Sequence, residues 1–211
     1  MNCGGIILCG GRSSRMGLAK ATLPFGPELM LPRVVRLLGQ VCEPLVVVAA
    51  PEQSLRELSS AVTVVRDRRE GRGPLEGLLA GLSALPDACD AAYATSCDVP
   101  LLVPAFVGRM IALLEGHDIA VPHLEGFHHP LSAVYRRPVR EHVEALLAQD
   151  RLRPFFLFER CDTRNVMADE LTDVDPRLLT LRNLNTPEDY LAALAEAGFT
   201  APAEVLANFT G

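Results

Sequence analysis

Short apolar runs alternate with amphipathic stretches through the first 116 residues, and this alternation restricts the fold more than any other feature of the chain. The runs are rich in Val, Ile, Leu and Ala, and the two longer ones lack polar alternation, as is typical of parallel strands covered on both faces. Repeated strand-then-helix order predicts an α/β domain: a three-layer, Rossmann-like, mostly parallel wound sheet with right-handed crossovers. We expect strands at 4–9, 44–50, 62–65 and 91–97, and helices at 31–42, 54–61, 74–85 and 104–116.

The pattern loosens after Gly116. A helix over 186–198 has the clearest signal, because Thr186 suits the N-cap, Pro187 the first helical position and Gly198 the end. The final dozen residues are expected to form a loosely held tail. The remaining expected elements are strands at 117–122 and 130–136, a helix at 137–149 and a shorter helix at 153–159.

The length of 211 residues suits a single domain over 1–211 with a sizeable core. Apolar residues make up 49% and charged residues 22%, a composition typical of soluble globular proteins. The longest apolar runs fall far short of the roughly 20 residues that a membrane helix needs, and no signal-peptide pattern opens the chain. We therefore expect a cytoplasmic protein with no membrane partner.

Cysteine and charge patterns restrict the ligand class. The six cysteines show no C-x-x-C pair and no zinc-finger spacing, and most lie in apolar segments, which predicts buried, unpaired thiols. A net charge of −6 argues against a nucleic-acid partner, because such binding depends on neutralising phosphates. Positive charge gathers in the loop after the first strand and in RDRREGR at 66–72, which favours a small anionic ligand.

Ligands of wound sheets bind beyond the carboxyl ends of the strands, which directs attention to the loop after the first strand. There, Gly10 and Gly11 let the backbone approach anionic oxygens, while Arg12, Arg15 and Lys20 supply permanent positive charge. The loop matches neither the P-loop nor the G-x-G-x-x-G pattern. The residues alone leave it open between an anion site and an ordinary solvated turn.

Asp98 directly follows the strand expected at 91–97, where a carboxylate beside a phosphate loop suits Mg²⁺; a turn-forming Asp before Pro100 is the alternative. RDRREGR precedes a helix whose N-terminus favours an anion, so this loop either closes on a phosphate-bearing ligand or is an ordinary charged surface loop. Two further pairs stay open between ligand contacts and surface or turn residues: His128 with His129, and Asn183 with Asn185.

LCGGRSSRMGLAK, at 8–20, resembles the signature loop of nucleotidyltransferases with the glycosyltransferase-A-like, or nucleotide-diphospho-sugar transferase, sheet. The general form is L-x-[AG]-G-x-[ST]-x-R-[ML]-G followed by Lys. GPLEGLLAGL, CDVPLL, HPLSAVYRR and NLNTPEDY are similar to successive motifs of the molybdenum cofactor guanylyltransferase family, so the resemblance spans about residues 6–190. The residues of the loop in register are Gly10, Gly11, Ser13, Arg15, Met16, Gly17 and Lys20.

The resemblance implies that GMP moves from GTP to the phosphate of molybdenum-molybdopterin, with Mg²⁺ as cofactor and pyrophosphate as product. It implies a nucleotide-binding half at about 1–115, an acceptor-binding half at about 116–200, and transient contact with proteins that mature molybdenum enzymes. The implied catalytic residues are Arg15, Lys20 and Asp98, with Asp98 as metal ligand. The implied nucleotide contacts are Leu8, Cys9, Gly10, Gly11, Lys20, Asp67 and Asp98, and the implied acceptor contacts are His129, Pro130, Asn183 and Asn185.

One departure from the family bears on the base. Members often carry an asparagine after the second strand that helps to select it, whereas VVVAAPEQS at 46–54 has none. The alternatives are a relative with another base or acceptor (cytidylyl transfer to molybdopterin, guanylyl transfer to cobinamide phosphate, or a sugar phosphate) and a non-catalytic nucleotide-binding module. Gly10–Gly11 and GPLEGL resemble the guanylyl branch more than the cytidylyl branch, while Lys20 and Asp98 argue against the module.

Overall fold

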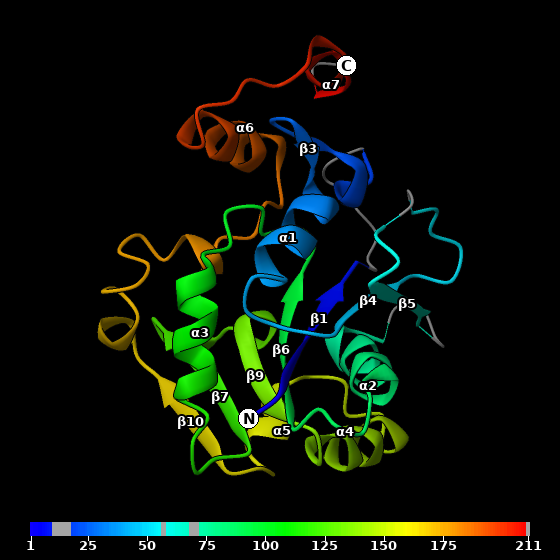
Figure 1. Ribbon diagram of the computed structural model, residues 1–211, viewed down its shortest axis with the longest axis vertical. Helices are drawn as coiled ribbons and strands as arrows, with labels where there is room; N and C mark the ends of the chain where they lie inside the picture. Colours follow the sequence, from blue (N-terminus) through cyan, green and yellow to red (C-terminus); the bar gives the residue numbers. More distant parts are fainter. Residues whose placement is uncertain (10–17, 56–57, 68–71, 210–211) are drawn as a thin grey trace.

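An eight-stranded sheet with helices on both faces forms the body of the protein in the computed structural model, which describes residues 1–9, 18–55, 58–67 and 72–209 (Figure 1). The strand order is β10-β7-β9-β6-β1-β4-β5, with β8 paired to β7. β9 is antiparallel to β6 and β7, and the other pairs on this path are parallel, so the predicted three-layer, mostly parallel sheet is confirmed. The strands are β1 (Cys3–Leu8), β4 (Leu45–Ala49), β5 (Val62–Arg66), β6 (Ala91–Ser96), β7 (Ile119–Leu124), β8 (Phe127–His128), β9 (Ala133–Arg136) and β10 (Thr163–Val166).

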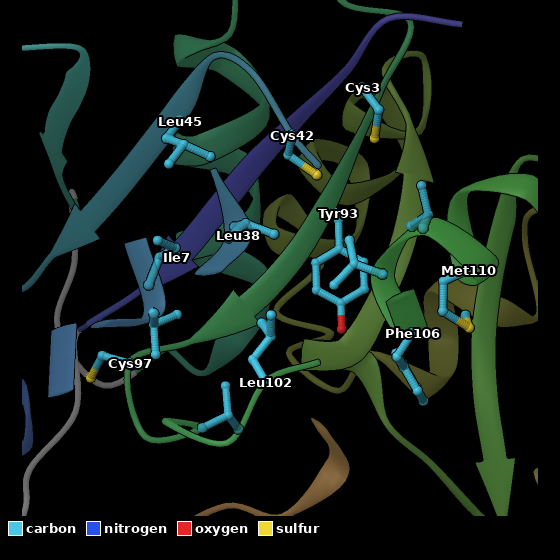
Figure 2. Close-up of a cluster of buried hydrophobic side chains, with 14 of the residues drawn as sticks. Cys3, Ile7, Leu38, Cys42, Leu45, Tyr93, Cys97, Leu102, Phe106 and Met110 are labelled. Atoms are coloured by element: carbon cyan, nitrogen blue, oxygen red, sulfur yellow. The ribbon is translucent and has the colours of Figure 1, made fainter. Parts of the chain in front are cut away.

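Alternating side chains of the central strands divide the core into two layers, one on each face of the sheet. Ile7 and Tyr93 pack with α1 (Met30–Leu38) and α3 (Pro104–Ala112), the cluster drawn in Figure 2. Their neighbours Ile6 and Ala92 pack on the opposite face with α2 (Pro74–Ala84), α4 (Val139–Ala148) and α5 (Phe155–Phe158). β1, β4 and β6 are buried along their whole length, which explains their apolar sequences.

A third apolar cluster lies beyond the sheet, where α6 (Pro187–Glu196) and α7 (Ala203–Phe209) stand together at one end of the molecule (Figure 1). Here the expectation of a loose C-terminal tail is wrong. Val205 is 7% exposed and the Phe209 ring lies 5.9 Å from that of Tyr190, so α7 is packed by its own apolar face. The cluster also takes in the hairpin of β2 (Pro24–Phe25) and β3 (Glu28–Leu29).

The helix expected at 54–61 is the second wrong prediction, because residues 54–55 and 58–61, which the structure describes, are not helical. The carbonyl groups before this stretch are satisfied in another way. Arg66, at the end of β5, donates from its guanidinium to the carbonyl oxygens of Ala50 at 2.7 Å, Pro51 at 3.0 Å and Gln53 at 2.9 Å. A single side chain therefore holds the connection between β4 and β5 in an irregular form.

The structure describes all six cysteines, and each is buried and unpaired, which confirms the prediction. Over the described residues, no helix has the length and apolar character that crossing a membrane requires. Both predicted halves of the chain contribute strands to the one sheet. The division of the domain into nucleotide and acceptor halves stays a prediction. The remaining short elements are the 3-10 helices η1 (Lys20–Thr22), η2 (Pro130–Ser132), η3 (Ala168–Glu170) and η4 (Leu179–Leu181).

Candidate active site

Asp98 lies at the centre of a polar network just beyond the carboxyl end of β6. Its Oδ2 is 2.7 Å from Lys20 Nζ, and its Oδ1 accepts a hydrogen bond of 2.9 Å from Asn183 Nδ2. The Ser96 hydroxyl also donates to Oδ1. Asp98 is 9% exposed, and a carboxylate so far removed from water is tolerated because its charge is paired and hydrogen-bonded.

The segment before α6 contacts both Asp98 and Lys20. Lys20 Nζ lies 2.9 Å from Asn185 Oδ1 as well, and the backbone N–H of Leu184 donates to the Asp98 carbonyl oxygen at 2.9 Å. A capping box between Thr186 and Asp189 begins α6, and Asp189 Oδ2 accepts from the Asn185 N–H at 3.1 Å. Asn183 and Asn185, which were expected to contact the acceptor, thus contact Asp98 and Lys20, which were expected to contact the nucleotide.

The carboxyl end of β1 lies beside the end of β6 that precedes Asp98. Leu8 pairs with Ser96 in the parallel register of β1 and β6, and the Cys97 N–H donates to the Leu8 carbonyl oxygen at 3.0 Å. On the other side, the Cys9 N–H donates to the Val48 carbonyl oxygen at 2.7 Å. The structure therefore places Leu8, Cys9 and Lys20 at one edge of the sheet. The predicted site residues Gly10, Gly11 and Arg15 lie outside the described residues.

Asp67 follows β5 at the same edge, and its N–H donates to the Ala49 carbonyl oxygen at 2.9 Å. Its Oδ1 is buried and has no hydrogen-bond partner among the described residues. Gly77 of α2 faces this oxygen: a Cβ there would lie 3.4 Å from Asp67 Oδ1 and 3.0 Å from a Leu8 methyl. Burial, and then the Glu76 carboxylate, raises the pKa of Asp67. Asp67 Oδ1 is therefore a buried acceptor to which no described residue donates.

The two arginines at the ends of the cationic segment 66–72 bind groups of the protein itself, so they are less available to a phosphate than the composition of the segment suggests. Arg66 donates to three carbonyl oxygens in the connection that follows β4. Arg72 donates to the Leu147 carbonyl oxygen at 2.8 Å and lies 3.5 Å from the Glu76 carboxylate and 3.2 Å from that of Asp150. Two of the four arginines of this segment are thus engaged within the protein. The other two, Arg68 and Arg69, lie outside the described residues.

His129 and Pro130 also lie at the carboxyl edge of β6. Ala133 pairs with Ala94 in antiparallel register, so the residues preceding β9 run toward the end of β6 that carries Asp98. The His129 N–H donates to the Pro122 carbonyl oxygen at 2.9 Å, and Tyr135 Oη donates to that of Pro130 at 2.7 Å. Burial, followed by His123 and His128, lowers the pKa of His129, which favours a neutral imidazole at pH 7.

Sequence reasoning missed two members of this network, Ser96 and Asp189. Ser96 occupies a buried strand position, and no local signal separates it from an ordinary strand residue. Asp189 stands three residues after Thr186, in the spacing of a capping box, and this signal could have identified it as the residue that orients the start of α6.

The sequence model of the MobA-like NTP transferase domain matches residues 5–163. The chain belongs to the MobA-like NTP transferase family. Among its relatives in this family, a protein named probable molybdenum cofactor guanylyltransferase from Mycobacterium avium (strain 104) is 37% identical over 202 residues, covering 93% of this chain and 97% of the relative. A protein of the same name from Pelotomaculum thermopropionicum is 32% identical over 193 residues, covering 90% of each chain.

A solved structure supports the fold assignment to the MobA-like family. The molybdopterin-guanine dinucleotide biosynthesis protein A of Archaeoglobus fulgidus superposes with a TM-score of 0.79 over 92% of this chain and 98% of that one, at 21% identity. At that identity the likeness shows the fold alone. The resemblance read from the sequence motifs and the nucleotidyltransferase fold are both confirmed.

Proposed function

We propose that the protein transfers GMP from GTP to the terminal phosphate of molybdenum-molybdopterin, giving molybdopterin guanine dinucleotide and pyrophosphate. The observation that carries this proposal is the Asp98 carboxylate, held by Lys20 and Asn183 beside the start of the opening loop. The names of the relatives, at 32% to 37% identity, supply the acceptor and the base.

The reaction needs no protein nucleophile. A phosphate oxygen of the acceptor forms a bond to the α-phosphorus of GTP, while the bond to the bridging oxygen breaks and pyrophosphate leaves with the electron pair. Catalysis by this chain is therefore positioning and neutralisation of charge. Lys20 and Arg15 offset charge on the phosphates, and Lys20 exchanges the carboxylate of Asp98 for phosphate oxygens when the nucleotide binds.

The side chains at Asp98 fit a divalent ion. Asp98 Oδ2 and Asn185 Oδ1 already converge on one cationic group, the Lys20 ammonium, at 2.7 and 2.9 Å. Mg²⁺ prefers oxygen ligands and takes one or two carboxylates together with phosphates and water. We assign it to Asp98, with Asn185 Oδ1 as a second oxygen. When bound, the ion polarises the α-phosphate.

The remaining assignments combine the family resemblance with the places of Leu8, Cys9 and Asp67 at this edge of the sheet. The backbone of Leu8, Cys9, Gly10 and Gly11 approaches the nucleoside, and Asp67 Oδ1, which lacks a partner among the described residues, accepts a donor from it. On the acceptor side we place His129, Pro130, Asn183 and Asn185. Cytoplasmic location and contact with proteins that mature molybdenum enzymes stay predictions.

The test is release of pyrophosphate from GTP, CTP or ATP with Mg²⁺ and molybdenum-molybdopterin. We expect activity with GTP, and a loss of about 100-fold or more in Asp98→Asn, because the carboxylate that would hold Mg²⁺ at the reacting phosphate is removed. Asp90→Asn is the matched control, since Asp90 is an exposed carboxylate at the opposite end of β6. Activity with CTP alone would identify a cytidylyl transferase, and no activity with any nucleotide would indicate a binding module.

A further inference from the structure

Three rings form a stack at the carboxyl end of β7. The imidazoles of His123 in β7 and His128 in β8 have centroids 4.6 Å apart with an angle of 41° between their planes. The His128 ring lies 4.8 Å from that of Phe158, the last residue of α5, at 47°. Aromatic pairs at these separations attract one another, so the three side chains are held as a unit.

The middle ring of this stack is fixed on several sides. His123 and His128 are register partners in the antiparallel pair of β7 and β8. His128 Nε2 lies 3.0 Å from Asn165 Oδ1 of β10. Burial lowers the pKa of His128, which favours a neutral ring at pH 7. Among the described residues, His123 has one ring neighbour, His128, and it is half-buried at the end of the stack.

The stack is level with the Asp98 network. Ala120 of β7 and Tyr93 of β6 both pair with Val134 of β9, so His123, three residues further on, stands level with Ser96. Only β9 separates these two strands in the sheet (Figure 1). With neighbouring strands about 4.8 Å apart, the distance across the sheet between the two positions is about 10 Å.

His123 and Ser96 also share a face of the sheet. Ala92 and Ala94 of β6, and Ile119 and Val121 of β7, pack in the cluster with α2, α4 and α5. Since side chains alternate along a strand, Ser96 and His123 fall on this same face. Leu131 of η2 packs against that cluster too, and η2 contacts both β6 and β7. The apolar side chain of Leu131 therefore belongs to the part of this face between the strand of Ser96 and the strand of His123.

We propose that the stack of His123, His128 and Phe158 binds the pterin ring of the acceptor, which lies against His123 while its phosphate reaches Asp98. The inference rests on the proposed function and assigns the acceptor's ring end, which the Asp98 network does not contact. A flat heteroaromatic ring suits such a platform because it stacks on an imidazole face and leaves its polar edges to hydrogen-bond elsewhere.

The experiment compares wild type with His123→Ala, His123→Phe and His142→Ala. Binding of the fluorescent probe 6-carboxypterin gives a Kd without catalysis, and pyrophosphate release gives separate KM values for molybdenum-molybdopterin and GTP. We expect His123→Ala to raise the probe Kd and the molybdopterin KM by about 10-fold or more, the usual effect of losing one stacked ring. His123→Phe keeps a ring and should stay near wild type. His142, exposed on α4, is the matched control.

The GTP KM of His123→Ala should be unchanged. An unchanged probe Kd and molybdopterin KM in His123→Ala would overturn the inference, and so would an equal rise in the GTP KM. A lower melting temperature of His123→Ala together with loss of probe binding in His123→Phe would point to a structural role instead. If no nucleotide yields pyrophosphate, yet the probe binds wild type and not His123→Ala, the proposed function fails while the ring site stands.

Discussion

Asp98 and Asp67 are both carboxylates at the carboxyl edge of the sheet, yet their surroundings differ. The charge of Asp98 is offset by Lys20 at 2.7 Å and by hydrogen bonds from Ser96 and Asn183. Asp67 has a buried oxygen without a partner among the described residues, and burial raises its pKa. Asp98 is therefore stabilised in the free protein, whereas the buried oxygen of Asp67 carries a cost in stability.

Asp67→Asn should therefore stabilise the free protein at neutral pH. Because the folded-state pKa of Asp67 is raised, the ionised form opposes folding above that pKa, and wild type regains stability as pH falls through it. We expect the variant to melt about 1 to 3 °C higher at pH 8, with a smaller difference at pH 4, close to the ordinary pKa of an aspartate. Thermal melts at both pH values, with Asp90→Asn as control, would measure this. A lower melting temperature for Asp67→Asn at pH 8 would contradict it.

At the scale of elements, the start of α6 connects helix formation with the site. Thr186 Oγ1 accepts from the Asp189 N–H at 3.2 Å, and Asp189 Oδ2 accepts from the N–H groups of Thr186 and Asn185 at 3.0 and 3.1 Å. This cap satisfies donors that a helix leaves open and orients the segment carrying the two asparagines.

Removing the cap hydroxyl should affect stability and activity together. Thr186→Ala is expected to lose about 1 kcal/mol of unfolding free energy, the usual effect at an N-cap, and to lower kcat because Asn183 and Asn185 are less firmly held. Denaturant melts and the pyrophosphate assay would measure both. Thr186→Ser keeps the hydroxyl and should restore them. A loss of stability with unchanged kcat would show that the cap stabilises α6 without affecting the site.

At the scale of the whole molecule, the C-terminal helices α6 and α7 pack against the hairpin of β2 and β3. Val205 and Phe209 of α7 join Phe25, Tyr190 and their neighbours in one apolar cluster. Residues from both ends of the sequence therefore share one core, and α6, which begins at the site, is packed in it as well.

Phe209→Ala should destabilise the protein although it lies within three residues of the C-terminus. Removing a ring packed on Tyr190 should lower the melting temperature by about 3 to 6 °C, in proportion to its partial burial. Phe127→Ala is the control, because Phe127 is 73% exposed. Equal melting temperatures for the Phe209 and Phe127 variants would mean that the tail is loosely held after all.

Local patterns explain which parts of this architecture could be predicted. The apolar run of β1, the periodicity of α2 and the cap of α6 each lie within a few neighbouring residues, so sequence alone identified them. The helix at 54–61 was a wrong prediction, since the described residues of this segment are irregular and the connection just before it is held by Arg66, a residue of a later strand. The packed tail was missed because the partner of Phe209 is Tyr190, outside its own helix.

The sequence by itself determined most of the strands and helices along the chain, and with them the edge at which Leu8, Asp67 and Asp98 emerge, because the carboxyl ends of parallel strands meet at one edge of a wound sheet. Only the tertiary structure decided which polar groups meet there. Lys20 and Asn183 reach Asp98 across 78 and 85 positions of the chain. Such contacts depend on how the whole sheet closes, and no window of neighbouring residues contains that information.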